Sequence, residues 1–540
     1  MKKNLTYWLL ALLLVSAPVP FAACSDGGDD GPVAAADVIN VADDSKSQNL
    51  AADVSLTTIT FNASGAWTAS VADDAPWVSL DKASGEAGDN AIAVRLEVNQ
   101  GADARTATIS LSCGEVTVTV SISQFAANEE DNADGGREDV MLQAFYWDSQ
   151  KMTGWKQLMK MEDEIAKSFS CVWLPPSASA EGGNAVGGTN VGYHPRQWND
   201  QNSCWGTAAD LKSLIAGLHD KGVKVIADIV INHRAGDTAW GNFTEDDFGD
   251  YGKYQLTAAN ICNDDEMNDP DQCSDPNWLG KATGAADTGE NWGGARDLDF
   301  TSDYVRQDCE AYLNWLKGEF GYDGWRFDFC KGYDGKYVGM LNDASSPWLS
   351  VGELWDGSYD VVNAWLKAAG YKSMAFDFPQ KYDALNNGLA KKDFAKMSWK
   401  EDGVTPRPAG LIHHASTRAY AVTFVDNHDT YRDDSKYTGN VTHAYAFILS
   451  SPGVPCVFWP HWQDANCRSA IEKMIEARKS VGVSSASDVK VTASSTYYEA
   501  VATGRRGSLL CRIGVKAPTS VPEGYVKACS GSGWAFYTKK

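Results

Sequence analysis

Three acidic residues follow apolar segments whose composition predicts buried β-strands. Asp328 lies in GYDGWRFDF, Glu353 in SVGELWD and Asp429 in FVDNHD. Arg326 stands two residues before Asp328, and His428 directly precedes Asp429. Cleavage of a sugar acetal needs one carboxylate as nucleophile, one carboxylic acid to protonate the leaving oxygen, and negative charge near an oxocarbenium-like carbon. These five side chains suit that chemistry.

The strands predicted to carry these acids would place them at a useful separation. Neighbouring strands lie about 4.8 Å apart, and a retaining glycosidase needs its two carboxyl groups about 5–5.5 Å apart. Asp328 and Glu353, on predicted strands four and five, can meet that spacing. Arg326 shares a strand face with Asp328, and its cation should keep that carboxylate ionised. Apolar neighbours on both sides of Glu353 should raise its pKa, as an acid catalyst requires.

The elements that position these residues read as an α/β chain. From residue 139 short apolar strands alternate with amphipathic helices, and eight such units can be counted by about residue 480. This pattern predicts a (β/α)8 TIM barrel over residues 139–484, with its active site at the carboxyl ends of the strands. Residues 234–296, rich in Gly, Asp and Asn, predict an inserted domain. Residues 485–540 predict a C-terminal antiparallel β domain.

The part before the barrel has a different character. Residues 37–126 alternate apolar and polar side chains between turn clusters, which predicts a small β-sandwich. Acidic, Gly-containing residues 127–138 predict a linker, and residues 24–36 predict a flexible tether.

Several longer motifs carry a resemblance to a known family. DIVINH (residues 228–233), GYHP (192–195), ICNDD (261–265) and ADTGENWGGARDLDF (286–300) occur in order with the three acidic segments. Together they resemble the α-amylase superfamily of glycoside hydrolases over roughly residues 139–540, most closely its plant-type members. The resemblance implies that the insertion is the B domain. It further implies retaining endo-hydrolysis of α-1,4-glucosidic bonds in starch, glycogen and maltooligosaccharides.

The resemblance also assigns roles to matching residues. Asp328 would be the nucleophile, Glu353 the general acid/base and Asp429 the acid that stabilises the transition state. The substrate contacts implied are Tyr193 as an aromatic platform, His233 and His428 as hydrogen-bond partners of the sugar at the cleavage point, Arg326 beside the nucleophile, and Lys331 and Trp355 on the leaving-group side.

A calcium site is implied in the same way. The ligands would be the side chains of Asn232, Asp287 and Asp297 with the backbone carbonyls of Glu290 and Gly332. All are oxygen donors, as a hard cation requires. The alternative is that these Asp and Asn residues only form turns. Arg296 stands where a neutral residue would be expected, and a second calcium near Asp264 stays open.

The first residues predict a targeting segment. Lys2 and Lys3 precede an apolar run over residues 9–15, which is too short to span a membrane. Ala22-Ala23-Cys24 resembles a bacterial lipobox, so residues 1–23 would be a lipoprotein signal peptide and Cys24 the lipidated residue; plain secretion is the alternative. The acidic tether resembles that of Bacteroidetes surface lipoproteins. This implies an enzyme anchored in the cell envelope, on the outer membrane and facing outward.

The predicted sandwich resembles the BACON domain of Bacteroidetes glycan enzymes. The resemblance rests on Trp67-Thr-Ala-Ser, Pro-Trp77-Val-Ser and the final Ser-Ile-Ser-Gln. Such a domain could bind glycan or mucin, or it could be a spacer with both tryptophans in its core. We favour the spacer.

The net charge indicates which binding partners the protein can have, and the cysteine content indicates where thiols or disulfides can form. A net charge of −24 over 540 residues argues against nucleic acid and fits a neutral polysaccharide. Among 12 cysteines, Cys171, Cys330 and Cys456 should be buried thiols, whereas Cys262 and Cys273 share a loop and could pair. We expect a monomer, which other surface proteins for glycan uptake could accompany.

Competing functions remain open at this point. A non-catalytic glycan-binding protein on the same scaffold should have lost an acid, and all three are present. Transglycosylases, debranching enzymes and exo-acting enzymes of the superfamily share these acids.

Overall fold

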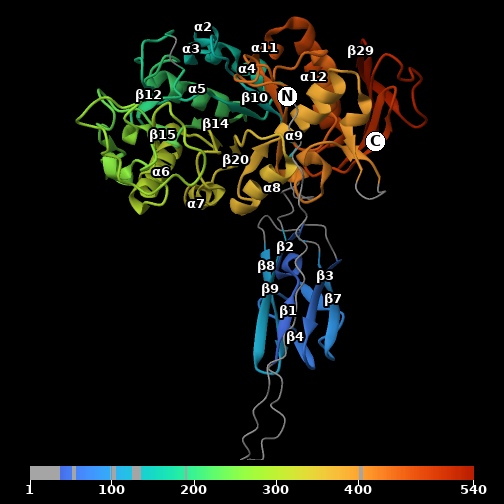
Figure 1. Cartoon of the computed structure of the whole chain (residues 1–540). Coiled ribbons are helices and arrows are strands. Elements are labelled where there is room, and N and C mark those ends of the chain that lie inside the picture. Colours follow the sequence, from blue (N-terminus) through green and yellow to red (C-terminus); the bar gives the residue numbers. More distant parts are fainter. Residues whose placement is uncertain are drawn as a thin grey trace, which may run out of the picture. The chain divides into compact units, whose positions relative to one another are not determined.

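The computed structural model describes residues 37–50, 56–97, 99, 105–124, 136–188, 191–400 and 405–540. The described residues form two compact units, one within residues 37–123 and one that contains residues 136–540 (Figure 1). The predicted signal peptide, Cys24 and tether, and most of the predicted linker, lie outside the described residues.

The N-terminal unit consists of two β-sheets. Their strand orders are β1-β3-β7-β5 and β2-β9-β8-β4-β6. The strands are β1 Ile39–Val41, β2 Ser47–Leu50, β3 Leu56–Ala63, β4 Trp67–Val71, β5 Val78–Leu80, β6 Ser84–Gly85, β7 Gly88–Leu96, β8 Arg105–Cys113 and β9 Val116–Gln124. Phe61 of one sheet meets Trp67 of the other edge to face, with ring centroids 4.9 Å apart. The predicted two-sheet sandwich is therefore present.

The described aromatic rings of this unit all lie in its core. Its described residues include three aromatic side chains, Phe61, Trp67 and Trp77, and each is buried. Sugars are commonly bound on exposed aromatic faces, which use the amphipathic character of Tyr and Trp. The burial of both tryptophans agrees with the spacer interpretation.

The second unit is built on a closed barrel of eight parallel strands, in the order β10-β11-β14-β19-β20-β21-β24-β25. They are β10 Met141–Gln143, β11 Cys171–Trp173, β14 Lys224–Ile229, β19 Gly324–Phe327, β20 Leu349–Gly352, β21 Met374–Phe376, β24 Ala421–Phe424 and β25 Val454–Phe458. Nearly every strand residue is buried, as expected where helices cover the outside of a parallel sheet. The predicted TIM barrel is confirmed.

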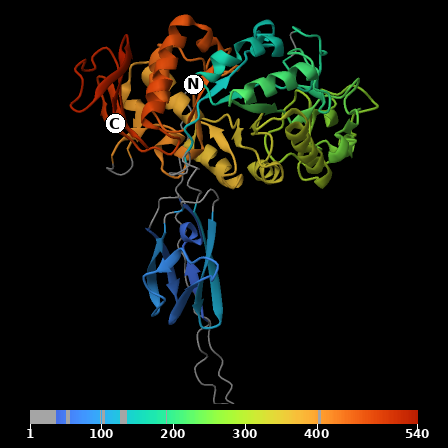
Figure 2. The ribbon, with the colours of Figure 1, turned by 180° about the vertical axis from the view of Figure 1, so that it is seen from behind.

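Helices surround the barrel (Figures 1 and 2). The longer ones are α5 Ala208–Asp220, α6 Asp303–Trp315, α7 Gly335–Ser345, α8 Tyr359–Ala368, α10 Val441–Leu449 and α12 Ala465–Val481. In α5, Leu211, Leu214, Ile215 and Leu218 are buried, the spacing of one helix face. Thr207 is the N-cap residue of this helix, and its side chain and that of Asp210 form a capping box.

The insertion after β14 is made of short elements. It opens and closes with an antiparallel pair, β15 His233–Arg234 against β18 Arg296–Asp297, in which His233 faces Asp297. Between them lie β16 Asp246–Asp247, β17 Lys253–Tyr254 and single turns of 3-10 helix. This ladder ties the two ends of the insertion to each other.

The chain ends in a five-stranded antiparallel sheet, as predicted, in the order β26-β27-β28-β30-β29. Its strands are β26 Val489–Ser494, β27 Tyr498–Gly504, β28 Gly507–Ile513, β29 Val526–Gly531 and β30 Trp534–Lys539.

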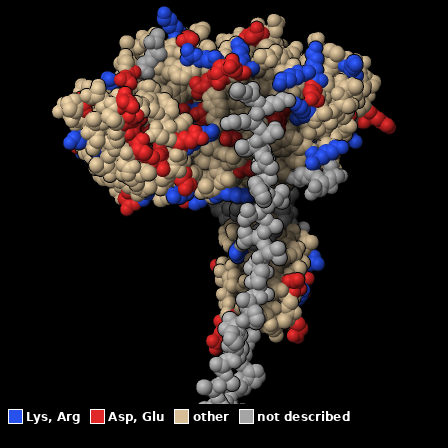
Figure 3. All heavy atoms as spheres, viewed as in Figure 1, with Lys and Arg blue, Asp and Glu red and all other residues tan. Residues whose placement is uncertain are grey.

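Every described cysteine is a free thiol. Cys171, Cys330 and Cys456 are buried, as predicted, and Cys262 and Cys273 are buried without pairing. Within the described ranges, no helix combines the length and the apolar character needed to cross a membrane. Acidic and basic side chains are both scattered over the face of the barrel unit seen in Figure 3.

Candidate active site

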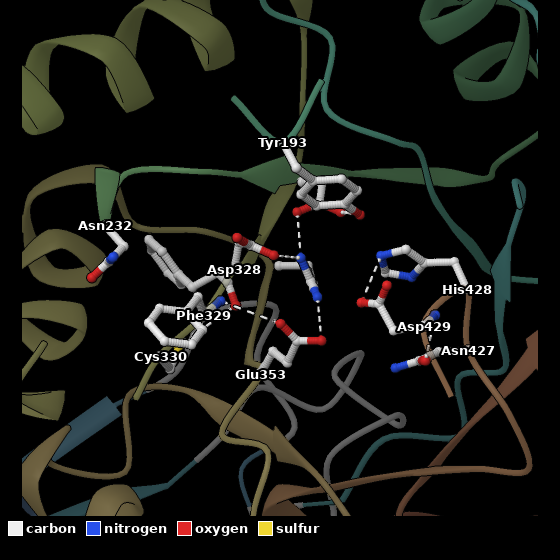
Figure 4. A network of polar contacts seen from close by, with 12 residues as sticks. Tyr193, Asn232, Asp328, Phe329, Cys330, Glu353, Asn427, His428 and Asp429 are labelled. Carbon is white, nitrogen blue, oxygen red and sulfur yellow. Dashed lines mark hydrogen bonds and ion pairs between the residues drawn. The ribbon is translucent and has the colours of Figure 1, made fainter. Parts of the chain in front are cut away.

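The three acids come from strand ends. Asp328 directly follows β19 and Glu353 directly follows β20, which are neighbours in the barrel. Asp429 lies in the loop after β24. Figure 4 shows the three carboxyl groups turned toward a common centre. The fold therefore brings together the acids that sequence reasoning selected.

A single arginine lies among these carboxylates. Nη1 of Arg326 donates to Oδ1 of Asp328 at 2.6 Å and to Oδ1 of Asp228 at 2.7 Å. Its Nη2 lies 2.7 Å from Oε1 of Glu353. The Arg326 side chain is fully buried. One guanidinium therefore contacts three carboxyl groups inside the barrel mouth and helps to fix where each of them lies.

Glu353 is set up as a proton donor. Burial raises its pKa to about 8; the Arg326 cation opposes this shift, and the charges of Asp328 and Asp429 add to it. Its Oε2 accepts a hydrogen bond from the backbone N–H of Phe329 at 3.2 Å. Phe329 has φ of 41°, a left-handed conformation that is uncommon for a bulky residue. The carboxyl group is therefore mostly protonated at neutral pH, as its apolar flanks predict.

Asp429 is held by its own loop and by the first strand's loop. Trp147 Nε1 donates to its Oδ1 at 2.9 Å, and His428 Nε2 lies 3.2 Å from its Oδ2. The side chain of Asn427 accepts hydrogen bonds from the backbone N–H groups of Asp429 and Thr430. The Asp429 side chain is 30% exposed, against 11% for Asp328 and 7% for Glu353. It is the acid most open to a ligand.

The predicted substrate contacts gather around the acids. The Tyr193 hydroxyl donates to Oδ2 of Asp228 at 2.7 Å, and its ring stacks on His428 with centroids 5.2 Å apart. His233 Nε2 lies 2.8 Å from the carbonyl oxygen of Tyr193. Burial lowers the pKa of His233 to about 4 and that of His428 well below its ordinary value. Both imidazoles are therefore neutral at neutral pH.

Lys331 and Trp355 lie on the loops after β19 and β20. Lys331 Nζ is 3.3 Å from Glu290 and 3.6 Å from Asp356, and its side chain is 26% exposed. Trp355 donates to the hydroxyl of Tyr382 at 2.7 Å. Both side chains are partly accessible at the edge of the acid cluster.

Sequence reasoning missed four residues of this centre. Asp228 accepts from both Arg326 and Tyr193, Gln143 contacts Nδ1 of His428 at 3.0 Å, Trp147 donates to Asp429, and Trp292 lies with its ring centroid 4.0 Å from that of His233. Asp228 and Gln143 had a readable signal, since each is a polar residue near the end of an apolar strand. The two tryptophans had none, because Trp is also ordinary core material.

The residues of the expected calcium site also lie close together. Asn232 donates to Asp297 at 2.9 Å, and the backbone N–H of Glu290 donates to the carbonyl oxygen of Lys331. A Cβ at position 332 would come within 1.9 Å of Oδ1 of Asn232, so this amide oxygen packs directly against Gly332. Oδ2 of Asp287 is buried and has no hydrogen-bond partner among the described residues.

This set fits a hard cation in its chemistry. Burial raises the pKa of Asp287 to about 6 and that of Asp297 to about 8, a cost that a bound cation would offset. The described residues hold no cluster of three or more His, Cys, Asp or Glu side chains suited to a metal. The expected set contains two carboxylates only, together with an amide and two carbonyls. Arg296 pairs with Glu266 and Asp265, so its charge is offset there.

A closed parallel barrel with acids on adjacent strand ends, joined through one arginine, defines a barrel-type glycoside hydrolase. Comparison with known proteins makes this more specific. Residues 168–461 match the family described as alpha amylase, catalytic domain, and residues 41–127 match the viral BACON domain. The chain belongs to the α-amylase family and is a hydrolase that acts on α-glucans.

Two relatives illustrate the range of this likeness. "Probable alpha-amylase 2" of Arabidopsis thaliana is 33% identical over 388 residues, which cover 68% of this chain and 86% of the relative. A glucan 1,4-alpha-maltotetraohydrolase of Roseateles saccharophilus is 28% identical over 414 residues, which cover 68% of this chain and 66% of the relative.

Solved structures support the fold. An α-amylase from Malbranchea cinnamomea aligns with a TM-score of 0.53 at 16% identity, over 74% of this chain and 96% of that one. The α-amylase from Geobacillus thermoleovorans in complex with acarbose aligns with a TM-score of 0.50 at 15% identity. The alignment covers 74% of this chain and 98% of that one.

Proposed function

We propose that this enzyme cleaves α-1,4-glucosidic bonds inside starch, glycogen and maltooligosaccharides, with retention of anomeric configuration. One observation carries the proposal: Asp328 and Glu353 sit on adjacent strand ends and contact the two terminal nitrogens of one guanidinium. That placement suits a nucleophile and an acid/base about 5–5.5 Å apart.

In this mechanism Asp328 attacks the anomeric carbon while Glu353 gives its proton to the leaving glycosidic oxygen. The carbon–oxygen bond of the substrate breaks and an ester bond to Asp328 forms. Glu353, now ionised, takes a proton from water, and the resulting hydroxide displaces Asp328. Asp429 would stabilise the positive charge on the sugar, and Tyr193 with the two neutral histidines would hold that sugar in place.

Two substitutions and one spectrum test this proposal. Asp328→Asn and Glu353→Gln should each reduce starch hydrolysis by several orders of magnitude and leave the melting temperature close to that of the wild type. NMR of the first products from the wild type should show the α-anomer before mutarotation. Near-wild-type turnover in either variant, or β-anomeric products, would refute the assigned roles.

An exo-acting mode is the second candidate, because one relative is named a maltotetraohydrolase. An endo-enzyme cuts amylose into mixed lengths early, and iodine staining falls before much reducing sugar appears. An exo-enzyme releases one short product from the start. Product profiles on amylose, with pullulan as a branch-type control, distinguish the two modes.

Calcium binding is part of the same proposal. The Asn232 and Asp297 side chains, the unpartnered Asp287 carboxylate, and the carbonyls of Glu290 and Gly332 would hold the ion. Bound calcium would neutralise these buried acids and fasten the insertion to the loop that follows Asp328. The support is the oxygen-only set and the buried carboxylate oxygen that lacks a partner.

We further propose that the enzyme is anchored at the cell surface through lipidated Cys24. The support is the apolar run, the small residues before Cys24 and the acidic tether. Two or more acyl chains give stable membrane attachment, and the BACON-type unit would act as a spacer that faces outward. Cys24→Ser should release the enzyme from the membrane fraction, and external protease should remove starch hydrolysis from intact wild-type cells. Wild-type activity found only in the soluble periplasm would refute the anchor.

A further inference from the structure

Lys381 is a fully buried lysine that takes no part in the catalytic steps. It is the first residue of η7 Lys381–Leu389, a π-helix that continues α9 Phe378–Gln380 after barrel strand β21. Its side chain has no exposed surface. π-helices are rare and are frequent at functional sites, and a buried charge needs specific partners. The contacts of Lys381 therefore indicate what this segment does.

The start of η7 is held in place by Asp377, which directly follows β21. The carboxylate of Asp377 accepts hydrogen bonds from the backbone N–H groups of Gln380 and Leu411, both at 2.9 Å. Its carbonyl oxygen accepts from the N–H of Lys381 at 3.0 Å. The backbone of Lys381 is therefore fixed at the end of β21, whose neighbour in the barrel is β24.

The ammonium group of Lys381 reaches the end of β24. Nζ donates to the carbonyl oxygen of Val425 at 2.9 Å and to Oδ1 of Asp426 at 2.8 Å. The Asp426 side chain is also fully buried. Nε2 of His461 lies 3.8 Å from Oδ2 of Asp426, but burial lowers the pKa of His461 to about 4. At neutral pH, Lys381 is therefore the cation that faces the charge of Asp426.

Asp426 anchors the loop that carries Asp429. Its Oδ1 also accepts a hydrogen bond from the hydroxyl of Thr430 at 3.2 Å. That hydroxyl accepts from the backbone N–H of Asn427 at 2.9 Å, and the side chain of Asn427 accepts from the N–H of Asp429 at 3.0 Å (Figure 4). A continuous chain of hydrogen bonds therefore runs from the ammonium of Lys381 to the backbone of Asp429.

Asp429 depends on this loop more than its neighbour His428 does. His428 is also held from other strands, because Gln143 contacts its Nδ1 at 3.0 Å and the ring of Tyr193 stacks on its imidazole. The carboxylate of Asp429 accepts from Trp147 and is 30% exposed. The position of Asp429 therefore rests largely on the backbone of its own loop.

The pair of Lys381 and Asp426 offers direction more than stability. Well-packed apolar residues can often replace a buried ion pair without loss of stability, because desolvation of the two charges offsets their attraction. The contacts of this pair are directional, however. The ammonium meets two oxygen acceptors, and Oδ1 of Asp426 meets both the ammonium and the Thr430 hydroxyl. Such a network fixes the position of the groups that it joins.

We propose that Lys381 is a positioning residue for Asp429. Through Asp426 and the hydrogen bonds of Thr430 and Asn427, it sets the place from which the Asp429 carboxylate acts on the sugar. The proposal rests on the hydrolysis proposed above, in which Asp429 stabilises the transition state. An interaction made in the transition state changes kcat more than substrate binding, so loss of Lys381 lowers kcat and leaves KM close to that of the wild type.

A double-mutant cycle on the full-length enzyme tests this coupling. An aryl maltooligosaccharide with a good leaving group keeps slow variants measurable. Lys381→Met should lower kcat about ten- to hundredfold in the wild type, the cost of a misplaced catalytic group. In the Asp429→Asn background the same substitution should lower kcat by no more than about twofold, because its effect passes through Asp429. An equal loss of kcat in both backgrounds would overturn the proposal.

Lys391→Met is the matched control, because Lys391 is exposed, follows the same π-helix and donates to Asn387. This variant should keep the kcat of each background. The double variant Lys381→Met/Asp426→Asn leaves no unpaired charge in the core, so it takes the place of Lys381→Met in the cycle if that variant does not fold. It should melt close to the wild type and still have a lowered kcat; recovery of the wild-type kcat would also overturn the proposal.

Failure of the proposed function would give a different result. A wild-type kcat in Asp429→Asn would remove the role of Asp429 in the reaction, and the positioning role of Lys381 with it. A large loss of kcat in Asp429→Asn, together with an equal effect of Lys381→Met in both backgrounds, would overturn the positioning role alone.

Discussion

Two groups of buried acids differ in what offsets their charge. At the mouth of the barrel, Asp228, Asp328 and Glu353 all contact the guanidinium of Arg326. In the insertion, Asp297 is buried and Asp287 is half-buried, and the buried Oδ2 of Asp287 has no hydrogen-bond partner among the described residues. The first group carries its own cation and can do proton chemistry. The second group has none, so the same residue type becomes a candidate metal site.

Removing the internal cation should have the largest effect. Arg326→Met would leave three buried carboxyl groups without their common partner, and loss of one partner of a buried pair typically costs about 3–5 kcal/mol. We expect a much lower melting temperature and loss of starch hydrolysis. Arg326→Lys is the matched control: it keeps the charge but lacks the second nitrogen that reaches Glu353, so it should recover stability more than activity. A Met variant that melts like the wild type would contradict the comparison.

Removing the proposed calcium ion should have the next largest effect on stability. A ligand at one hundred times its Kd stabilises the folded state by about 2.7 kcal/mol. Chelator should therefore lower the melting temperature, and added calcium should restore it. Asp287→Asn should lose most of this response, whereas Asp271→Asn, an exposed acid of the same insertion, should retain it. Metal-free protein by elemental analysis with an unchanged melt would argue against a calcium site.

The pH dependence of activity distinguishes the acid/base from the other carboxyl groups. Because Glu353 must be protonated to donate and its pKa is raised to about 8, kcat/KM should fall as pH rises through about 8. The slope should approach about tenfold per pH unit. An aryl maltooligosaccharide whose nitrophenolate leaves without a proton should show a weaker fall. An equal fall of kcat/KM for both substrates, or unfolding of the enzyme over the same pH range, would contradict the role of Glu353 as the acid.

Asp308 is a buried acid that, among the described residues, contacts neither an arginine nor the proposed calcium site. Its substitution should change stability the least. Neither carboxyl oxygen of Asp308 in α6 has a hydrogen-bond partner among the described residues, and burial raises its pKa well above the ordinary 3.8. The stability associated with a raised pKa is present at low pH and is lost as pH rises. The side chain of the Asp308→Asn variant stays neutral at every pH. The melting temperature of this variant should therefore rise relative to that of the wild type as the pH increases from 4 to 8. Glu310→Gln, on the same helix but partly exposed, should not show this trend.

Much of the site was predictable because polarity within an apolar run marks a strand end. Asp328, Glu353 and Asp429 could be selected in this way, and the order of the barrel strands made the first two neighbours. The reach of Arg326 was only partly predictable. Strand alternation places it beside Asp328, but its contacts with Asp228 and Glu353 cross to adjacent strands and depend on register.

Other features depended on packing that no local pattern encodes. Trp147 reaches Asp429 across 282 positions of sequence, and Trp292 contacts His233 from the far end of the insertion. The loop cysteines show the same limit. Cys262 and Cys273 share a segment, yet each is buried as a separate thiol. Distance along the sequence therefore predicted neither the contacts of the two tryptophans nor the absence of a disulfide between the two cysteines.

The buried core of the second unit runs from Val140 to Phe536 and, among the described residues, includes none from the sandwich. Because each unit completes its own core, a gene fusion or deletion between them would exchange whole folding units. Such a module can be acquired, duplicated or lost by recombination with its own core intact. Evolution could therefore exchange the sandwich as a whole while the hydrolase keeps its own core.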